Sequence, residues 1–244
     1  MSRLTLAVVS SLALSALTGC ADNQESLIVL MAPLWNDDGD CSVTDATDAM
    51  LQGTLDLSFG TPYIMPALLY NQTLKQNAAK KNTGTMSNEL QIIDATVSLK
   101  MPQAPEIISQ LRAQDDALVH FDVPLSTNSI PPQSTAGVLV EIIPQQTAVA
   151  LATAVTDKFG AAARVTLKAD IQFHATRTGN TVGRVGEIDA REFSFPVSLC
   201  AGCLIDCSTC PNQMCPAQTT SFNGGVCGNA QDLPLIPAGC EEMN

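Results

Sequence analysis

The sequence predicts a mainly β protein, namely an antiparallel β-sandwich with one short helix, followed by a disulfide-rich irregular C-terminal tail. Three observations support this prediction. Apolar and polar residues alternate in several separate segments, which is typical of half-buried strands. Hydrophobic residues make up 45% of the chain but aromatic residues only 4%, so the core must be aliphatic. Of the nine cysteines, seven lie after residue 199, where no long alternating run occurs.

The strands are expected at intervals along residues 27–199. An apolar run at 27–35, broken only by Pro33, is expected to pack on the domain as an extended segment. Pro66 within 63–70 predicts an edge strand or a bend, because proline donates no hydrogen bond to a ladder. Clean alternation predicts further strands at 51–59, 94–101, 119–123 and 138–142, with Leu51, Gly53, Leu55, Leu57 and Phe59 on the inward side of the first.

One helix is expected between Pro144 and Gly160. The apolar residues from 148 to 155 follow helical spacing, and the glycine fits the end of a helix. Pro105 and Glu106 are expected to open a separate helical turn, because proline is favoured at the first helical position.

The clearest alternation covers residues 165–176 and is followed by the turn sequence Gly179-Asn180 and a return strand that ends at Leu199. This hairpin should be the spine of the sheet. About seven strands with regular turn signals suit an antiparallel sandwich. The order of elements over residues 47–199 resembles the immunoglobulin-like sandwich of late-embryogenesis-abundant and water-stress proteins. The resemblance implies an immunoglobulin-like fold, and it implies nothing about activity.

The first 19 residues have the composition of an export signal. Arg3 is their only charged side chain, and residues 4–17 form an apolar run too short to span a bilayer comfortably. The sequence Leu17-Thr18-Gly19-Cys20 resembles the lipobox of bacterial lipoproteins. This resemblance implies cleavage before Cys20, acylation of that cysteine and a membrane tether. Ala21, rather than aspartate, follows Cys20, which in enteric-type sorting favours the outer membrane over the inner membrane.

The chain is strongly and unevenly acidic. Its formal net charge is −12, which disfavours binding to nucleic acid. The expected N-terminal segment, residues 20–46, consists of the lipidated cysteine, a spacer and an acidic turn. In that turn Asp37, Asp38 and Asp40 flank a glycine and are candidate cation ligands, although the spacing does not match a calcium loop. The simpler interpretation is a solvated turn.

The cysteines predict a disulfide framework. Once Cys20 carries lipid, eight cysteines remain, and an exported chain meets an oxidising compartment. Because the tail at 200–244 holds seven of them, at least one must pair with Cys41 and join the two ends of the mature chain. The connectivity stays open. The eight disulfide candidates are Cys41, Cys200, Cys203, Cys207, Cys210, Cys215, Cys227 and Cys240.

Two C-x-x-C pairs in the tail, Cys200/Cys203 and Cys207/Cys210, allow three interpretations. Structural disulfides agree with the even count and the export signal. A zinc or iron–sulfur site would need a different spacing between the pairs. Thiol–disulfide catalysis would need a thiol of low pKa beside a cation, and residues 192–244 contain no Lys, Arg or His. The sequence favours structural disulfides.

No pattern of residues points to an enzyme. His120 and His174 fall on the polar side of strands, and no known nucleophile, metalloprotease or phosphate-binding motif occurs. We therefore expect a lipid-anchored cell-envelope protein that acts as a structural or interaction module, without cofactor. It would contact the membrane through Cys20 and be open to a protein partner. The alternatives are an envelope thiol–disulfide oxidoreductase or redox sensor that uses the C-x-x-C pairs, and a cation- or small-ligand-binding module that uses the acidic turn.

Overall fold

The computed structural model describes residues 26–35, 41, 43, 48–74, 88–125, 129–177, 187–208, 210, 222–238 and 240. The strands are β1 (Leu27–Met31), β2 (Gly53–Asp56), β3 (Tyr63–Asn71), β4 (Leu90–Lys100), β5 (His120–Pro124), β6 (Ser134–Ile143), β7 (Val165–Arg177), β8 (Glu187–Asp189), β9 (Phe193–Cys200), β10 (Phe222–Gly224) and β11 (Leu235–Pro237). The helices are α2 (Pro105–Gln114) and α3 (Gln145–Phe159), with short 3-10 helices η2 (Leu57–Phe59) and η3 (Asp116–Leu118).

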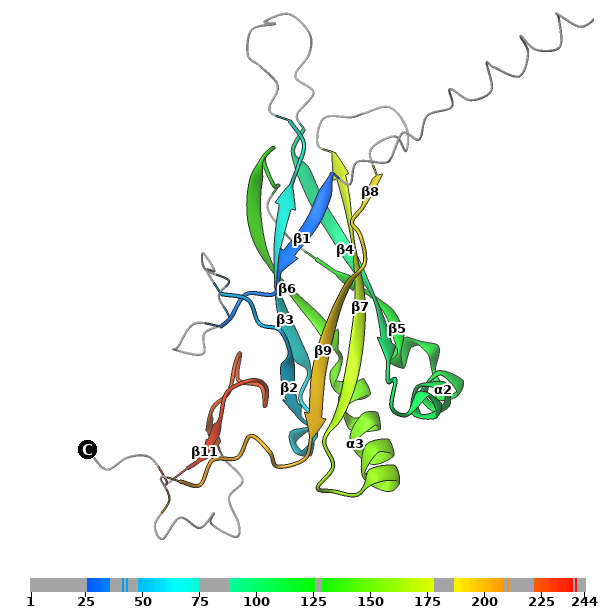
Figure 1. Ribbon diagram of the computed structural model, residues 1–244, viewed down its shortest axis with the longest axis vertical. Helices are drawn as coiled ribbons and strands as arrows, with labels where there is room; N and C mark the ends of the chain where they lie inside the picture. The colour runs from blue at the N-terminus through cyan, green and yellow to red at the C-terminus, as the bar shows by residue number, and fades with distance from the viewer. Residues whose placement is uncertain are drawn as a thin grey trace, which may run out of the picture.

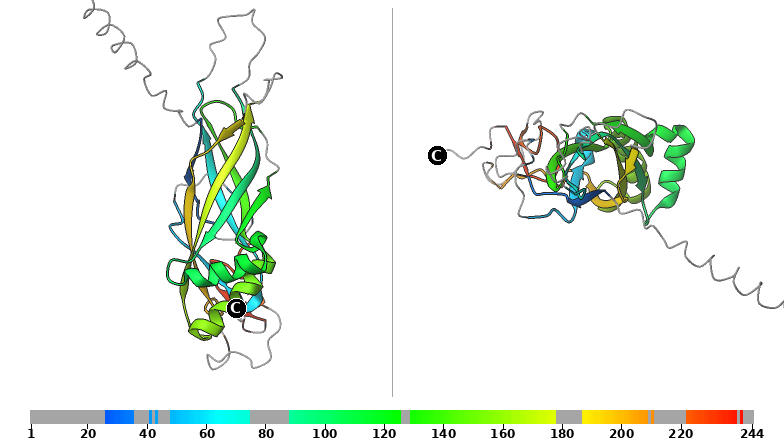
Figure 2. Two further views of the ribbon diagram at one scale, coloured as in Figure 1. Left: turned by 90° about the vertical axis from the view of Figure 1, so that its right-hand side faces the viewer. Right: turned by 90° about the horizontal axis from the view of Figure 1, so that it is seen from above.

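Two main sheets form a β-sandwich, which confirms the predicted mainly β fold. One sheet has the order β1-β3-β6, and the other has the order β2-β9-β7-β4-β5 with β8 paired to β7. Seen down the long axis, strands of both sheets surround a common interior (Figure 2, right). Buried residues of both sheets and both helices form one core cluster, which is largely aliphatic, as the composition predicts.

The hairpin formed by β7 and β9 is the spine of the larger sheet, as predicted. β7 has 13 residues and pairs antiparallel with β4 on one side and β9 on the other. Its inward side chains, among them Ile171 and Phe173, are fully buried. One pairing departs from the antiparallel pattern, because β2 runs parallel to β9.

The helices lie together at one end of the strands (Figure 1). α3 ends at Gly160, as predicted, and the turn expected at Pro105 is a helix of ten residues, so the described part of the chain contains two α-helices. The described chain begins at the opposite end of the strands, where the Arg177 guanidinium donates to the Ser26 hydroxyl at 3.3 Å. The first described residue and the helices are therefore separated by the length of the sandwich.

The strand expected at 51–59 is shorter in the structure, and two of its residues have the opposite burial to the one expected. β2 stops at Asp56, whose carboxylate accepts hydrogen bonds from the Ser58 nitrogen at 3.1 Å and hydroxyl at 2.6 Å and so turns the chain into η2. Asp56, expected in solvent, is 0% exposed, and Leu51, expected inside, is 85% exposed. These hydrogen bonds end the strand at Asp56, and Leu51 lies before the strand begins at Gly53, so no single strand covers residues 51–59.

Pro66 lies in a strand that is paired on both sides but not along its whole length. The backbone N–H and C=O of Ile64 point away from β6 and bond to the Gln231 side chain. Because backbone groups alternate along a strand, the nitrogen of Pro66, two residues later, points to the same side. On that side β1 pairs only with residues 68–71 of β3. The missing N–H of Pro66 therefore falls where β3 has a free edge, as the sequence suggested.

Gly53 lies directly against the ring of Tyr63. A Cβ at this position would overlap the Tyr63 hydroxyl and ring, and the ring is itself fully buried. We expect Gly53→Ala to lower the free energy of unfolding by about 1–3 kcal/mol, the usual cost of overpacking. Urea unfolding measures the change. Thr54→Ala, at the next position of the same strand, is the control and should cost less than about 1 kcal/mol.

Candidate functional site

The structure joins six of the eight candidate cysteines in three disulfides. These are Cys41–Cys227, Cys200–Cys203 and Cys210–Cys240. Cys207 is also disulfide-bonded. Cys41–Cys227 spans 186 residues, so a tail cysteine does reach Cys41, as the odd number in the tail predicted. Cys20 and Cys215 lie outside the described residues.

Part of the tail is built into the sandwich, which the sequence did not predict. The Asp56 nitrogen donates to the Ala230 carbonyl, and the Asp232 nitrogen donates to the Thr54 carbonyl, each at 2.9 Å. Residues 230–232 therefore pair with β2. The fully buried side chain of Gln231 reaches the other way, to β3.

Gln231 pairs with β3 as a peptide group would. Its Oε1 accepts from the Ile64 nitrogen at 2.9 Å, and its Nε2 donates to the Ile64 carbonyl at 2.8 Å. This satisfies a backbone donor and acceptor on the free edge of β3. We call residues 230–232, with the edges of β2 and β3 that they join, the seam. The seam connects β2 of the larger sheet to β3 of the smaller sheet by hydrogen bonds.

Asp232 is the acceptor at the centre of the seam. Its carboxylate accepts from the Thr54 nitrogen at 2.7 Å, the Tyr63 hydroxyl at 2.9 Å and the Trp35 Nε1 at 3.0 Å. It therefore links the tail to β2, to β3 and to the segment after β1. Burial raises the pKa of Asp232, although these hydrogen bonds act in the opposite direction. Burial, and then the charge of Asp232, raise the pKa of Tyr63 well above its usual value.

These pKa shifts predict a loss of stability with rising pH. Both groups hold their proton more tightly in the folded state than in the unfolded state. The contribution of Tyr63 is complete below the unfolded pKa of about 10 and is lost above it, because only the unfolded state then releases the proton. Asp232 also lowers the stability as the pH rises, beginning at the unfolded pKa of an aspartate, about 4. Urea unfolding at a series of pH values should show a steeper alkaline decline for the wild type than for Tyr63→Phe; parallel curves would contradict it.

The first C-x-x-C pair lies at a corner where two strands end together. Because β2 and β9 are parallel, Asp56 at the end of β2 is paired with Cys200 at the end of β9. The chain then turns at Gly202, with φ of 71°, and Cys203 closes the disulfide with Cys200. We call Asp56, Cys200 and Cys203 the CxxC corner. Asp56 and Cys200 are buried and Cys203 is half-buried.

Asp56 holds the loop of the CxxC corner. Besides its two bonds from Ser58, its carboxylate accepts from the Gly202 nitrogen at 2.8 Å and the Leu204 nitrogen at 3.1 Å. One carboxylate oxygen and the sulfurs of Cys200 and Cys203 all lie within 4.8 Å of one another. A buried carboxylate at this distance opposes the thiolate anions that reduction would generate. The arrangement favours the closed disulfide.

The two histidines lie on the outer face of the larger sheet, the polar side that the alternation predicted. His120 Nδ1 lies 2.8 Å from the Ser98 hydroxyl. His174 lies between Asp189 (Nδ1 to Oδ1, 2.7 Å) and Thr96 (Nε2 to Oγ1, 3.0 Å). The Thr96 hydroxyl donates to Asp122 at 2.7 Å, so its proton is not directed at His174 as that of an activated nucleophile would be.

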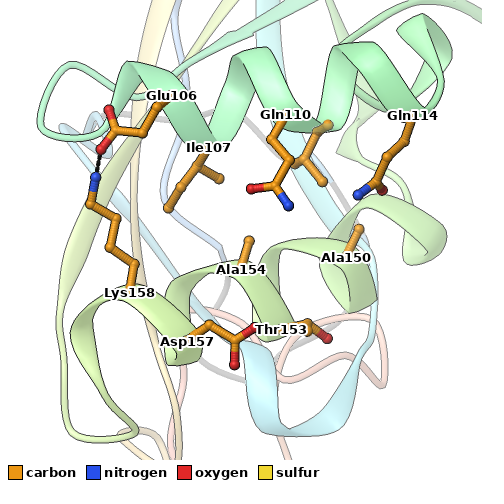
Figure 3. A pocket seen from close by; sticks show the side chains of 10 residues that line it. Glu106, Ile107, Gln110, Gln114, Ala150, Thr153, Ala154, Asp157 and Lys158 are labelled. Carbon is orange, nitrogen blue, oxygen red and sulfur yellow. Dashed lines mark ion pairs between the residues drawn. The ribbon is translucent and has the colours of Figure 1, made fainter.

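A groove of about 440 Å³ lies between α2 and α3 (Figure 3). The ion pair of Glu106 and Lys158 closes one end. Gln110 projects from α2 towards Ala154 of α3 (Figure 3). The small side chain of Ala154 leaves space for the groove at this point. The groove is lined by charged, amide, hydroxyl and apolar side chains. The sequence did not predict it, because it depends on how the helices meet.

The acidic turn with Asp37, Asp38 and Asp40 lies outside the described residues. In the part of the chain that the structure describes, no helix is long and apolar enough to cross a membrane. No protein-family model matches the chain, and no curated protein matches it.

Proposed function

We propose that the chain is a lipid-anchored cell-envelope protein that acts as a structural or interaction module without catalytic activity. The observation that carries the proposal is the use made of the cysteine-rich tail. Gln231 and Asp232 complete the seam. The Cys41–Cys227 disulfide ties the tail to the N-terminal part of the chain, and Cys210–Cys240 closes the tail on itself. A tail that closes the fold in this way contributes stability outside the cell rather than a reactive thiol.

The geometry also suggests how such a protein would be presented. The first described residue, Ser26, follows the lipidation candidate Cys20 by six residues and directly precedes β1. β1 begins at the end of the sandwich opposite α2 and α3 (Figure 1). β7, with 13 residues, spans about 40 Å of that length at the usual rise per residue. A lipid on Cys20 would therefore hold the Arg177 end near the bilayer and direct the interhelical groove away from it.

Thiol–disulfide exchange is the second candidate and has less support. An attacking cysteine needs an exposed thiolate beside a cation, whereas Cys200 is buried and its neighbour in the corner is the carboxylate of Asp56. The cation-binding alternative depends on the acidic turn at Asp37, Asp38 and Asp40, and calcium-dependent melting temperatures would test it.

The proposal is tested by expressing the full chain in a bacterial host with radiolabelled palmitate. We expect the label on the wild type, recovery of the protein in the membrane fraction, and loss of both in Cys20→Ala. Cys215→Ser is the matched control, because it removes a different cysteine and should keep the label. Unlabelled wild-type protein would overturn the lipid anchor. Turnover of a disulfide substrate by the purified protein, abolished in Cys203→Ser, would overturn the non-catalytic role.

A further inference from the structure

We propose that the CxxC corner becomes a zinc-type metal site when the Cys200–Cys203 disulfide is reduced. The ligands are the two cysteine sulfurs and a carboxylate oxygen of Asp56. This inference goes beyond the proposed function and does not depend on the lipid anchor. The tail C-x-x-C pairs fail as a two-knuckle zinc site because residues 204–206 leave little room between them, but the structure supplies a ligand from a distant strand.

The Asp56 carboxylate lies close enough to both cysteines to share an ion with them. One of its oxygens lies within 4.8 Å of Cys200 Sγ and Cys203 Sγ, which are bonded to each other in the disulfide and would move apart by roughly 2 Å on binding a metal. In a tetrahedral zinc site, ligand bonds of about 2.0–2.3 Å place neighbouring ligand atoms about 3.5–4 Å apart. Among the described residues, no other set of three His, Cys, Asp or Glu ligand atoms meets the same criterion.

Two of the three ligands are carried by paired strands, and the third, Cys203, lies in the loop that follows β9. Asp56 and Cys200 are paired across two parallel strands, so their relative position is set by backbone hydrogen bonds. The carboxylate of Asp56 is further fixed by donors, three to Oδ1 from Ser58 and Gly202 and one to Oδ2 from Leu204. Such bonds orient a ligating carboxylate in metal sites. Oδ2, with one donor, retains capacity to accept a metal ion.

Burial and charge favour a divalent ion over free thiols. Asp56 and Cys200 are buried, whereas Cys203 is half-buried, so the site would have three protein ligands and one position open to solvent. No described ion pair includes Asp56. Two thiolates beside this carboxylate would repel one another, and a divalent cation removes that repulsion. Thiolate ligands select zinc over magnesium or calcium.

The chemistry requires a reductant. A trialkylphosphine and one water molecule convert the Cys200–Cys203 disulfide to two thiols and give the phosphine oxide. Binding of Zn²⁺ then replaces the two thiol protons, which are released to solvent. The metal and the disulfide exclude each other, because the sulfurs can either bond together or ligate the ion. The corner therefore holds zinc only in its reduced form.

The test uses the full chain purified in detergent, reduced with a trialkylphosphine under argon and titrated with Co²⁺ and then Zn²⁺. We expect one Co²⁺ to bind per reduced chain. The thiolate-to-cobalt charge-transfer band should have the intensity of two cysteine ligands, and it should disappear when Zn²⁺ displaces the cobalt. The oxidised chain should show no such absorption. Cys203→Ser should lose it, whereas Cys207→Ser, which alters the other C-x-x-C pair, should keep it.

Asp56→Asn tests the carboxylate. We expect at least tenfold weaker cobalt binding, with circular dichroism used to confirm the fold. If this variant does not fold, the comparison of Cys203→Ser with Cys207→Ser still decides the outcome. Absence of binding to the reduced wild type, or equal binding by Cys203→Ser, would overturn the proposal, because the ion would then be held by other tail thiols. Neither result would affect the palmitate experiment.

Discussion

Replacing Asp232 by alanine is expected to lower the free energy of unfolding by about 3–5 kcal/mol, because several buried or half-buried donors lose their acceptor at a cost of about 1–3 kcal/mol each. Those donors are the Thr54 nitrogen, the Tyr63 hydroxyl and the Trp35 indole nitrogen. Tyr63 is fully buried, so water cannot readily replace the carboxylate. Denaturant unfolding of the oxidised protein measures the loss.

The control for Asp232→Ala is Asp206→Ala. Asp206 is a tail residue as well, but its carboxylate accepts a hydrogen bond from the nitrogen of Ser208, only two residues away. Its bond to a distant segment, from its backbone nitrogen to the Leu235 carbonyl, does not involve the side chain that the substitution removes. We expect Asp206→Ala to leave the unfolding curve unchanged within error. If Asp232→Ala behaved like Asp206→Ala, the seam would not stabilise the fold.

Removal of the Cys41–Cys227 disulfide is the second change with a large expected effect. The bond closes a loop with a sequence separation of 186 residues. The loss of loop entropy in the unfolded chain predicts a stabilisation of about 5 kcal/mol for a loop of this length. The double variant Cys41→Ser/Cys227→Ser should therefore unfold at a much lower denaturant concentration. The double replacement avoids a free thiol that could form new pairs.

The matched control removes the Cys200–Cys203 disulfide. Its sequence separation is 3, and the same relation predicts only about 2 kcal/mol for so short a loop. We therefore expect Cys200→Ser/Cys203→Ser to retain more of its stability than Cys41→Ser/Cys227→Ser. The reverse order would mean that the constraint on the unfolded chain does not govern the effect of these bonds.

Several elements of the fold could be predicted because their signal is local. The alternation over residues 165–176 matches β7, and the helical spacing before Gly160 matches α3. A strand with one buried face repeats every two residues and a helix every 3.6, whatever their neighbours are. The odd number of tail cysteines likewise required a bond to Cys41, and the structure pairs it with Cys227.

The prediction for Asp56 failed for the opposite reason. Alternation placed this residue in solvent, but the structure buries it completely. Two of the donors that satisfy it, the nitrogens of Gly202 and Leu204, are 146 and 148 residues away. No local pattern contains that information. The candidate metal ligand therefore became visible only when β2 was placed beside β9.

The sequence by itself determined the mainly β fold, the aliphatic core and the need for a bond between Cys41 and the tail, and it predicts a lipid anchor at Cys20. The tertiary structure alone decided the parallel pairing of β2 with β9, the groove between α2 and α3, and the seam. Gln231 and Asp232 bond to residues 167 and 178 positions away. Periodicity records which face of an element is buried. Hydrogen bonds between distant segments depend instead on which segments lie side by side, and that arrangement is set only when the chain folds.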